Sequence, residues 1–169
     1  RVHNDSGRRI GLVIAVDGRN LISGAKSHLG RDERMYVLDP RDSAVYEGWR
    51  TGRDRVHRFY FTDAADSYAD AFGDRSAMGV IAVAVFRERV PYRLPLELRE
   101  HSGGGGGPAP SRRSWAAEEP GTGFGESEWS PARRVDFEAE EQPVARHFLK
   151  YEWRESLCRK GIVDCRRPR

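Results

Sequence analysis

The sequence has no hydrophobic run long enough to cross a membrane. A spanning helix needs about 18 consecutive apolar residues, and the longest apolar run in this chain, residues 80–86, has only the length of a strand. Hydrophobic residues make up 38% of the 169 residues, and charged residues make up 33%. We therefore expect one domain, residues 1–169, with a modest core, a charged surface and no membrane span.

Lysine and cysteine are both scarce. Arginine supplies nearly all of the 29 basic residues, and 26 acidic residues leave a net charge of only +3. Nucleic-acid binding favours a concentrated basic patch, so we do not expect a nucleic-acid partner. The two cysteines, Cys158 and Cys165, lie close together near the C-terminus. They can form a disulfide in an oxidising compartment or remain two free thiols.

Signatures of catalysis and metal binding are also missing. No two histidines are four residues apart, and the sequence contains no C-x-x-C and no G-x-S-x-G motif. Such spacings bring zinc ligands together or expose a nucleophilic serine. We therefore expect no catalytic residue, no bound metal and no cofactor.

The first half of the chain consists of short runs that are typical of strands. The runs are "RRIGLVIAVDG", "RMYVLDP", "SAVYEGW", "DRVHRFYF" and "MGVIAVAVFRE". Asp17-Gly18 and Asp39-Pro40 supply turn signals between them. Their spacing predicts a mainly β protein: an antiparallel β-sandwich or barrel with one or two short helices and a long Gly/Pro-rich loop.

One acidic segment, "FTDAADSYADAFGD", interrupts this pattern. At 100° per residue its aspartates share one helix face, while Tyr68 and Phe72 lie on the opposite face. The segment therefore predicts a short amphipathic helix that ends at Gly73 and turns its carboxylates toward solvent or toward a basic partner. If the helix does not form, a cation site becomes the alternative, and its candidate ligands are Asp63, Asp66 and Asp70.

Residues 100–130 are rich in glycine, proline and serine and include five consecutive glycines. This composition predicts a long flexible insertion. After it, "PARRVDFEAE" predicts a strand with Val135 and Phe137 turned inward, and "VARHFLKYEW" fits a strand or a short helix. "RESLCRKGI" predicts a brief helix that ends at Gly161, and residues 163–169 form a basic tail.

Arginine alternates with aromatic residues in "EGWRTGRDRVHRFYF". Stacked arginine and aromatic side chains can bind an anionic ligand, such as a glycan, a lipid headgroup or nucleic acid. The same residues can equally form cross-strand pairs within a sheet. The candidate ligand-binding residues are Trp49, Arg50, Arg55, Arg58 and Tyr60.

The phrases "VDGRNLISG", "YVLDP", "YEGWR", "GVIAVAVFRE", "GTGFGE" and "KYEWRESLCRKGI" occur in this order along the chain. In this order the chain resembles a set of uncharacterised bacterial β-rich proteins over about residues 8–162. The resemblance implies a compact β-rich domain of an exported or envelope-associated protein. It transfers no catalytic residue.

The sequence is compatible with three functions. The first is a non-catalytic structural or interaction module, extracellular or in the cell envelope, that binds another protein or assembles with itself into an oligomer or filament. The second is a binding module for an anionic ligand that uses the arginine–aromatic strands. The third is an enzyme in which residues 100–130 form a lid over a site near Asp63, Asp66 or His57. A cytoplasmic location is the alternative to the envelope.

Overall fold

The computed structural model describes residues 1–73, 75–89 and 120–165. In this part of the chain the fold is mainly β, with one short helix and two 3-10 turns. The predicted fold class is therefore confirmed. The strands are β1 (Val2–His3), β2 (Ile10–Val16), β3 (Arg19–Asn20), β4 (Tyr36–Leu38), β5 (Ser43–Ala44), β6 (Gly48–Arg50), β7 (Arg55–Asp63), β8 (Val80–Arg87), β9 (Pro120–Trp129) and β10 (Ala145–Lys150).

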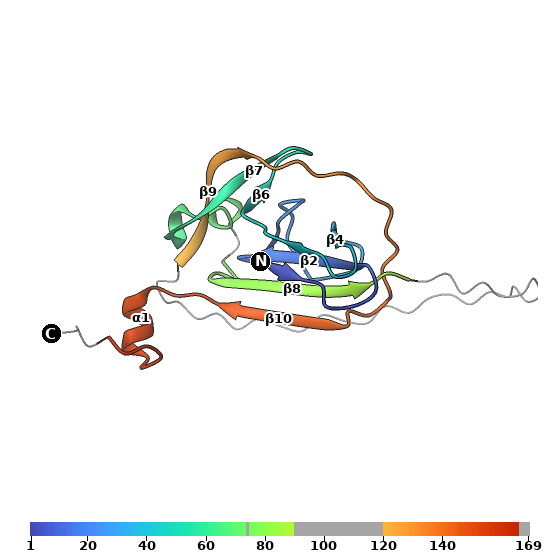
Figure 1. The fold of residues 1–169 in the computed structure, drawn as a ribbon. Helices are drawn as coiled ribbons and strands as arrows, with labels where there is room; N and C mark the ends of the chain where they lie inside the picture. The colour runs from blue at the N-terminus through green and yellow to red at the C-terminus, as the bar shows by residue number, and fades with distance from the viewer. Residues whose placement is uncertain (74, 90–119, 166–169) are drawn as a thin grey trace, which may run out of the picture.

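The strands form two main antiparallel sheets. The larger sheet has the order β10-β8-β2-β3, and β4 also pairs with β2. The smaller sheet has the order β6-β7-β9, and β1 pairs separately with β5. Figure 1 shows the smaller sheet lying across the larger one. Both sheets are open in the described residues, so the fold is not the barrel that the sequence also allowed.

Strand β2 is the centre of the core, because all seven of its residues are buried. In the pairing of β2 with β8, Leu12 lies opposite Val85 and Ile14 lies opposite Val83. These residues are on the face that packs against Trp49 of the smaller sheet. The other face opposes Val13 to Ala84. A strand that is buried on both faces must be apolar throughout, which explains the unbroken hydrophobic run.

The second face of β2 is covered by irregular segments. At Gly11 an added Cβ would lie 2.6 Å from a ring carbon of Phe137 and 2.8 Å from the sulfur of Met35. Glycine therefore allows both side chains to lie directly against the strand. Inward burial of Phe137 was predicted from the sequence.

The turn after β2 has the predicted sequence and conformation. Asp17 and Gly18 have φ values of 49° and 77°. A two-residue hairpin turn whose twist matches that of the strands requires positive φ at both central residues. The turn connects β2 to β3, with Val16 opposite Arg19.

The predicted amphipathic helix does not form. The segment instead contains two 3-10 turns, η1 (Ala64–Asp66) and η2 (Asp70–Phe72), with extended backbone at Ser67. The buried hydroxyl of Ser67 donates to the Ala64 carbonyl at 2.7 Å and accepts from the Asp70 amide at 3.2 Å. The Ser67 side chain thus supplies hydrogen bonds in place of those of a continuous helix. The next amide, that of Tyr68, donates to the Thr122 carbonyl of β9. Gly73 ends the segment as predicted, with a φ of 67°.

The predicted flexible insertion is wrong for its last part. Residues 120–129 form β9, which pairs with β7 from Asp63↔Pro120 to Arg55↔Trp129. The rest of the prediction, residues 100–119, lies outside the described residues. Residues 131–140, predicted as a strand, have only one isolated bridge in the described part of the chain, Glu88↔Ala139. Their described backbone hydrogen bonds to the end of β8 and the residues just after it involve only Glu138 and Glu140. The ambiguous run that follows is a strand, β10, paired with β8.

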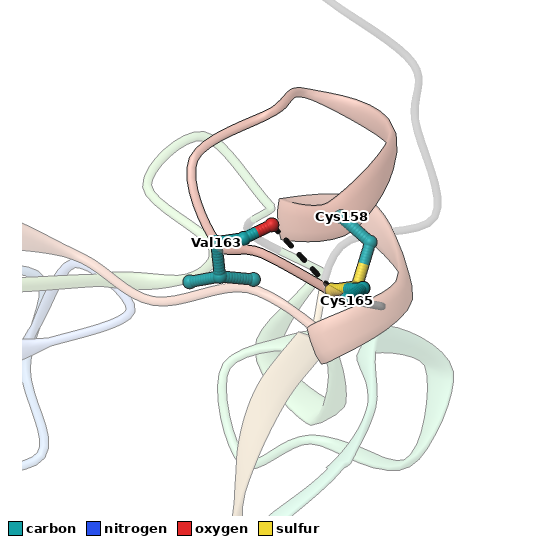
Figure 2. The surroundings of a disulfide bond; sticks show 3 residues. All are labelled: Cys158, Val163 and Cys165. Atoms are coloured by element: carbon teal, nitrogen blue, oxygen red, sulfur yellow. Dashed lines mark hydrogen bonds between the residues drawn. A yellow bond between two sulfur atoms is a disulfide. The ribbon is translucent and has the colours of Figure 1, made fainter. Parts of the chain in front are cut away.

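The C-terminal part forms the predicted brief helix, α1 (Arg154–Arg159), beyond the end of β10 (Figure 1). Gly161 follows it with a φ of 68°. Cys158 and Cys165 form a disulfide across Cα atoms 5.6 Å apart, and the Cys165 sulfur lies 3.5 Å from the Val163 carbonyl oxygen (Figure 2). Of the basic tail, residues 166–169 lie outside the described residues. Within the described residues, no helix has both the length and the hydrophobicity to span a bilayer.

We expect Trp49→Ala to destabilise the fold strongly. Trp49 is only 2% exposed, its ring packs on Phe59 and Tyr68, and its indole nitrogen donates to the Gly123 carbonyl at 3.3 Å. Removing a buried aromatic side chain costs about 3–5 kcal/mol of unfolding free energy. Urea denaturation followed by circular dichroism measures the loss. The control is Val45→Ala, because Val45 is 53% exposed; equal losses for the two variants would contradict the core described above.

Candidate functional site

A groove rich in arginine lies between β4, the turn after β6 and the segment that follows β9. Its volume is about 1000 Å³, and seven of its lining residues are arginine, against two aspartates. Figure 1 shows the connection from β9 to β10 running around the side of the molecule on which β4 lies. We call this site the arginine groove; its charged lining residues are Arg9, Arg31, Arg34, Arg50, Arg53, Arg133, Arg134, Asp39 and Asp42.

Two of the groove arginines hold its walls together. Arg50 on β6 donates from Nη1 to the Ser130 carbonyl at 2.9 Å and from Nε to the Tyr36 hydroxyl at 3.2 Å. It thereby connects β4 to the segment after β9. Arg9 lies 2.6 Å from a carboxylate oxygen of Glu88 and 3.4 Å from one of Asp39. Its charge is therefore neutralised by its neighbours.

Four other groove arginines form no ion pair with a described carboxylate, although two aspartates also line the groove. They are exposed, and their guanidinium groups make no ion pair within the described residues; they are Arg34, Arg53, Arg133 and Arg134. Arg31 lies 4.0 Å from the carboxylate of Glu141. A backbone hydrogen bond lowers the pKa of the neighbouring Asp32, and the charge of Arg31 adds to this shift. Grouped like charges at a concave surface raise the local concentration of counter-ions. Planar guanidinium groups also recognise carboxylate and phosphate with paired hydrogen bonds.

The structure separates the five ligand-binding residues predicted from the sequence. Trp49 is in the core rather than on a surface, and only Arg50 lines the groove. Arg55 and Arg58 are exposed on β7, where Arg55 donates to the Ser127 hydroxyl at 3.2 Å and Arg58 lies 3.4 Å from Glu128. Tyr60 is 48% exposed on the same strand. The predicted set therefore does not form one surface.

The candidate cation ligands do not converge either. Among the described residues, no three histidine, cysteine or acidic side chains are placed to hold one metal ion. Asp63 and Asp66 are exposed. Asp70 forms an ion pair with Arg75, and the hydrogen bond from that guanidinium lowers the pKa of the carboxyl below its ordinary value. This carboxylate already has a partner of opposite charge.

His57 lies beside the core with its ring occupied. Its Nδ1 is 2.7 Å from the Gly125 carbonyl, and its ring stacks on Phe124 at a centroid distance of 4.0 Å. The lid that the third function needs falls partly on residues 100–119, outside the described residues. Its remainder, residues 120–129, is strand β9.

The sequence reasoning missed a buried carboxylate that joins distant parts of the described structure. Asp17 is 1% exposed and accepts hydrogen bonds from the Gly79 amide at 2.8 Å, the Thr122 amide at 2.7 Å and the Tyr151 hydroxyl at 2.6 Å. These donors lie before β8, in β9 and after β10. In the sequence, the Asp-Gly turn is a sufficient reason for an aspartate at position 17. No further pattern indicated that its side chain is buried.

Comparisons with protein-family models, with curated proteins and with solved structures found no match. The resemblance to bacterial β-rich proteins stays a prediction. The chemistry of the arginine groove follows from its own residues, whose unpaired guanidinium groups are suited to binding negative charge.

We expect Asp17→Asn to destabilise the protein by about 2–3 kcal/mol, since one buried amide donor would then face an NH₂ group instead of an oxygen. Asp63→Asn is the matched control, because Asp63 is exposed, and its effect should stay within about 0.5 kcal/mol. Chemical denaturation of both variants provides the measurement. A loss at position 17 as small as that at position 63 would show that the buried bonds contribute little.

Proposed function

We propose that this chain is a non-catalytic interaction module that engages an anionic partner at the arginine groove. The proposal joins two of the functions expected from the sequence, association and anion binding. It places the binding surface at the groove instead of on β7. The observation that carries it is the set of four exposed, unpaired arginines around one concavity.

The geometry of the groove favours binding over a purely structural role for these arginines. Arg50 already connects Tyr36 to Ser130. Arg9 connects Asp39 to the Asp136 carbonyl. Arg34, Arg53, Arg133 and Arg134 add no ion pair to the fold in the described residues. The groove lining holds seven arginines against two aspartates, and such an excess of like charge is unfavourable for the isolated protein. An anionic partner would remove this repulsion.

Self-association is a second candidate function, and strand β10 supports it. β10 is at the edge of the larger sheet, and no described strand pairs with its other side. Phe148 and Leu149 on this strand are 64% and 55% exposed. An exposed edge strand with apolar side chains is a surface on which a second copy can add its own strand.

We also propose that the protein works outside the cytoplasm, in the cell envelope or the extracellular space. The Cys158–Cys165 disulfide supports this location, because disulfides persist in oxidising compartments.

The groove can be tested by charge reversal. We expect the double variant Arg34→Glu/Arg134→Glu to bind heparin dodecasaccharide or poly-L-glutamate at least about tenfold more weakly at 50 mM salt, since two attractive charges become repulsive. Fluorescence anisotropy with labelled polyanions measures the affinity.

The matched control is Arg55→Glu/Arg58→Glu, which changes the net charge by the same amount on exposed residues of β7. It should retain most of the affinity. If the control loses affinity instead, the binding surface is the one first predicted from the sequence. If the unaltered protein binds neither polyanion at low salt, the proposed function is wrong.

Self-association is tested with Phe148→Glu. We expect the unaltered protein to sediment as a dimer or larger species at high concentration, and the variant to sediment as a monomer, because a charge replaces an apolar contact at the strand edge. Val45→Glu is the control, since Val45 is similarly exposed and follows β5, which pairs with β1. A monomer at all concentrations for the unaltered protein would exclude this candidate.

A further inference from the structure

The arginine groove contains an open strand edge. β4 pairs with β2 through Ile10↔Leu38, Gly11↔Val37 and Leu12↔Tyr36, and no described strand pairs with its other side. Tyr36 and Val37 of this strand line the groove. The free side of a strand presents backbone amide and carbonyl groups at regular intervals, which is a template for another extended chain.

The opposite wall is also extended chain. Its ends are fixed, since the Ala132 amide donates to the Arg53 carbonyl at 2.7 Å and the Arg89 amide donates to the Glu138 carbonyl at 2.7 Å. Between these points, residues 133–137 make no described backbone-to-backbone hydrogen bond. The groove therefore lies between two segments whose backbones are not paired with each other.

The inner surface of the groove combines apolar side chains with the arginines. Met35, Val37, Val135 and Phe137 line it and are each partly buried. An extended peptide presents alternate side chains to opposite sides. One row of its side chains can contact these apolar groups, while the other row reaches the guanidinium groups.

The aromatic rings of the groove are not placed for stacking on nucleic-acid bases. Tyr36 packs on Tyr46 at a ring distance of 4.3 Å, and Phe137 lies against Gly11 with the Arg9 guanidinium 5.9 Å from its ring centre. Single-stranded nucleic acids bind mainly through stacking on exposed rings together with backbone charge. The open strand edge instead matches the backbone of a polypeptide.

We propose that the anionic partner is an acidic polypeptide segment, bound in extended form as an added strand along β4. This inference rests on the proposed function of the groove. Backbone pairing with β4 sets the register of the segment, and Arg34, Arg53, Arg133 and Arg134 select acidic side chains. The partner is thus recognised by alternating acidic and apolar residues rather than by charge alone.

A ten-residue peptide that alternates glutamate with valine, blocked at both ends, tests the proposal. Two further peptides carry N-methyl groups on either the odd or the even residues. In a strand, alternate amides point to opposite sides, so only one methylated peptide loses its hydrogen bonds to β4. We expect that peptide to bind at least about tenfold more weakly than the unmethylated one and the other to bind within about threefold, measured by calorimetry at 50 mM salt.

The other outcomes separate this inference from the proposed function. If both methylated peptides bind as tightly as the parent, binding depends on charge alone, and strand addition is wrong while the anionic site stands. If heparin dodecasaccharide or single-stranded DNA binds more tightly than the peptide, the partner is not an acidic polypeptide. The inference is then wrong, while the proposed anion-binding site stands. If Arg34→Glu/Arg134→Glu does not weaken binding of the peptide, the peptide binds outside the groove, and the inference is wrong.

Discussion

The burial of β2 on both faces is the constraint on which the rest of the described structure depends. One face is covered by the smaller sheet through Trp49. The other needs cover from segments that form no sheet, and Phe137 and Met35 provide it by lying on Gly11. The segment after β9 must therefore pass close to β4 on its way to β10, and the space left between them is the arginine groove. The candidate site follows from the way in which the core is closed.

The arginines of the groove are of two kinds: some make contacts that hold the fold together, and others make no ion pair within the described residues. Arg50 has its guanidinium hydrogen bonds taken up by the Tyr36 hydroxyl and by backbone carbonyls, so it fixes the distance between the walls. Under the proposed function, the four unpaired arginines would bind a partner without loosening the fold. This division agrees with the general pattern in which a rigid scaffold positions functional groups on its connecting segments.

The sequence predicted what local pattern determines. The apolar run of β2, the Asp17-Gly18 turn and the β-branched run of β8 were each recognisable, because alternation, burial and turn chemistry act within a few residues. β9 was missed because its glycines suggested a loop, whereas pairing with β7 decides its conformation. The groove was missed for a similar reason: its lining residues extend from Arg9 to Ala139, and only folding brings them together.

Asp17 has a consequence for the order in which the chain acquires its structure. Its donors follow it in the sequence by 62, 105 and 134 residues. A protein made from its N-terminus thus synthesises the acceptor first and the last of these donors, Tyr151, 134 residues later. Until Tyr151 has left the ribosome, this carboxylate lacks one of its three partners, and long-range closure of this kind is slow. The hydrogen bonds of Asp17 are therefore complete only after β10 and the tyrosine that follows it have been made.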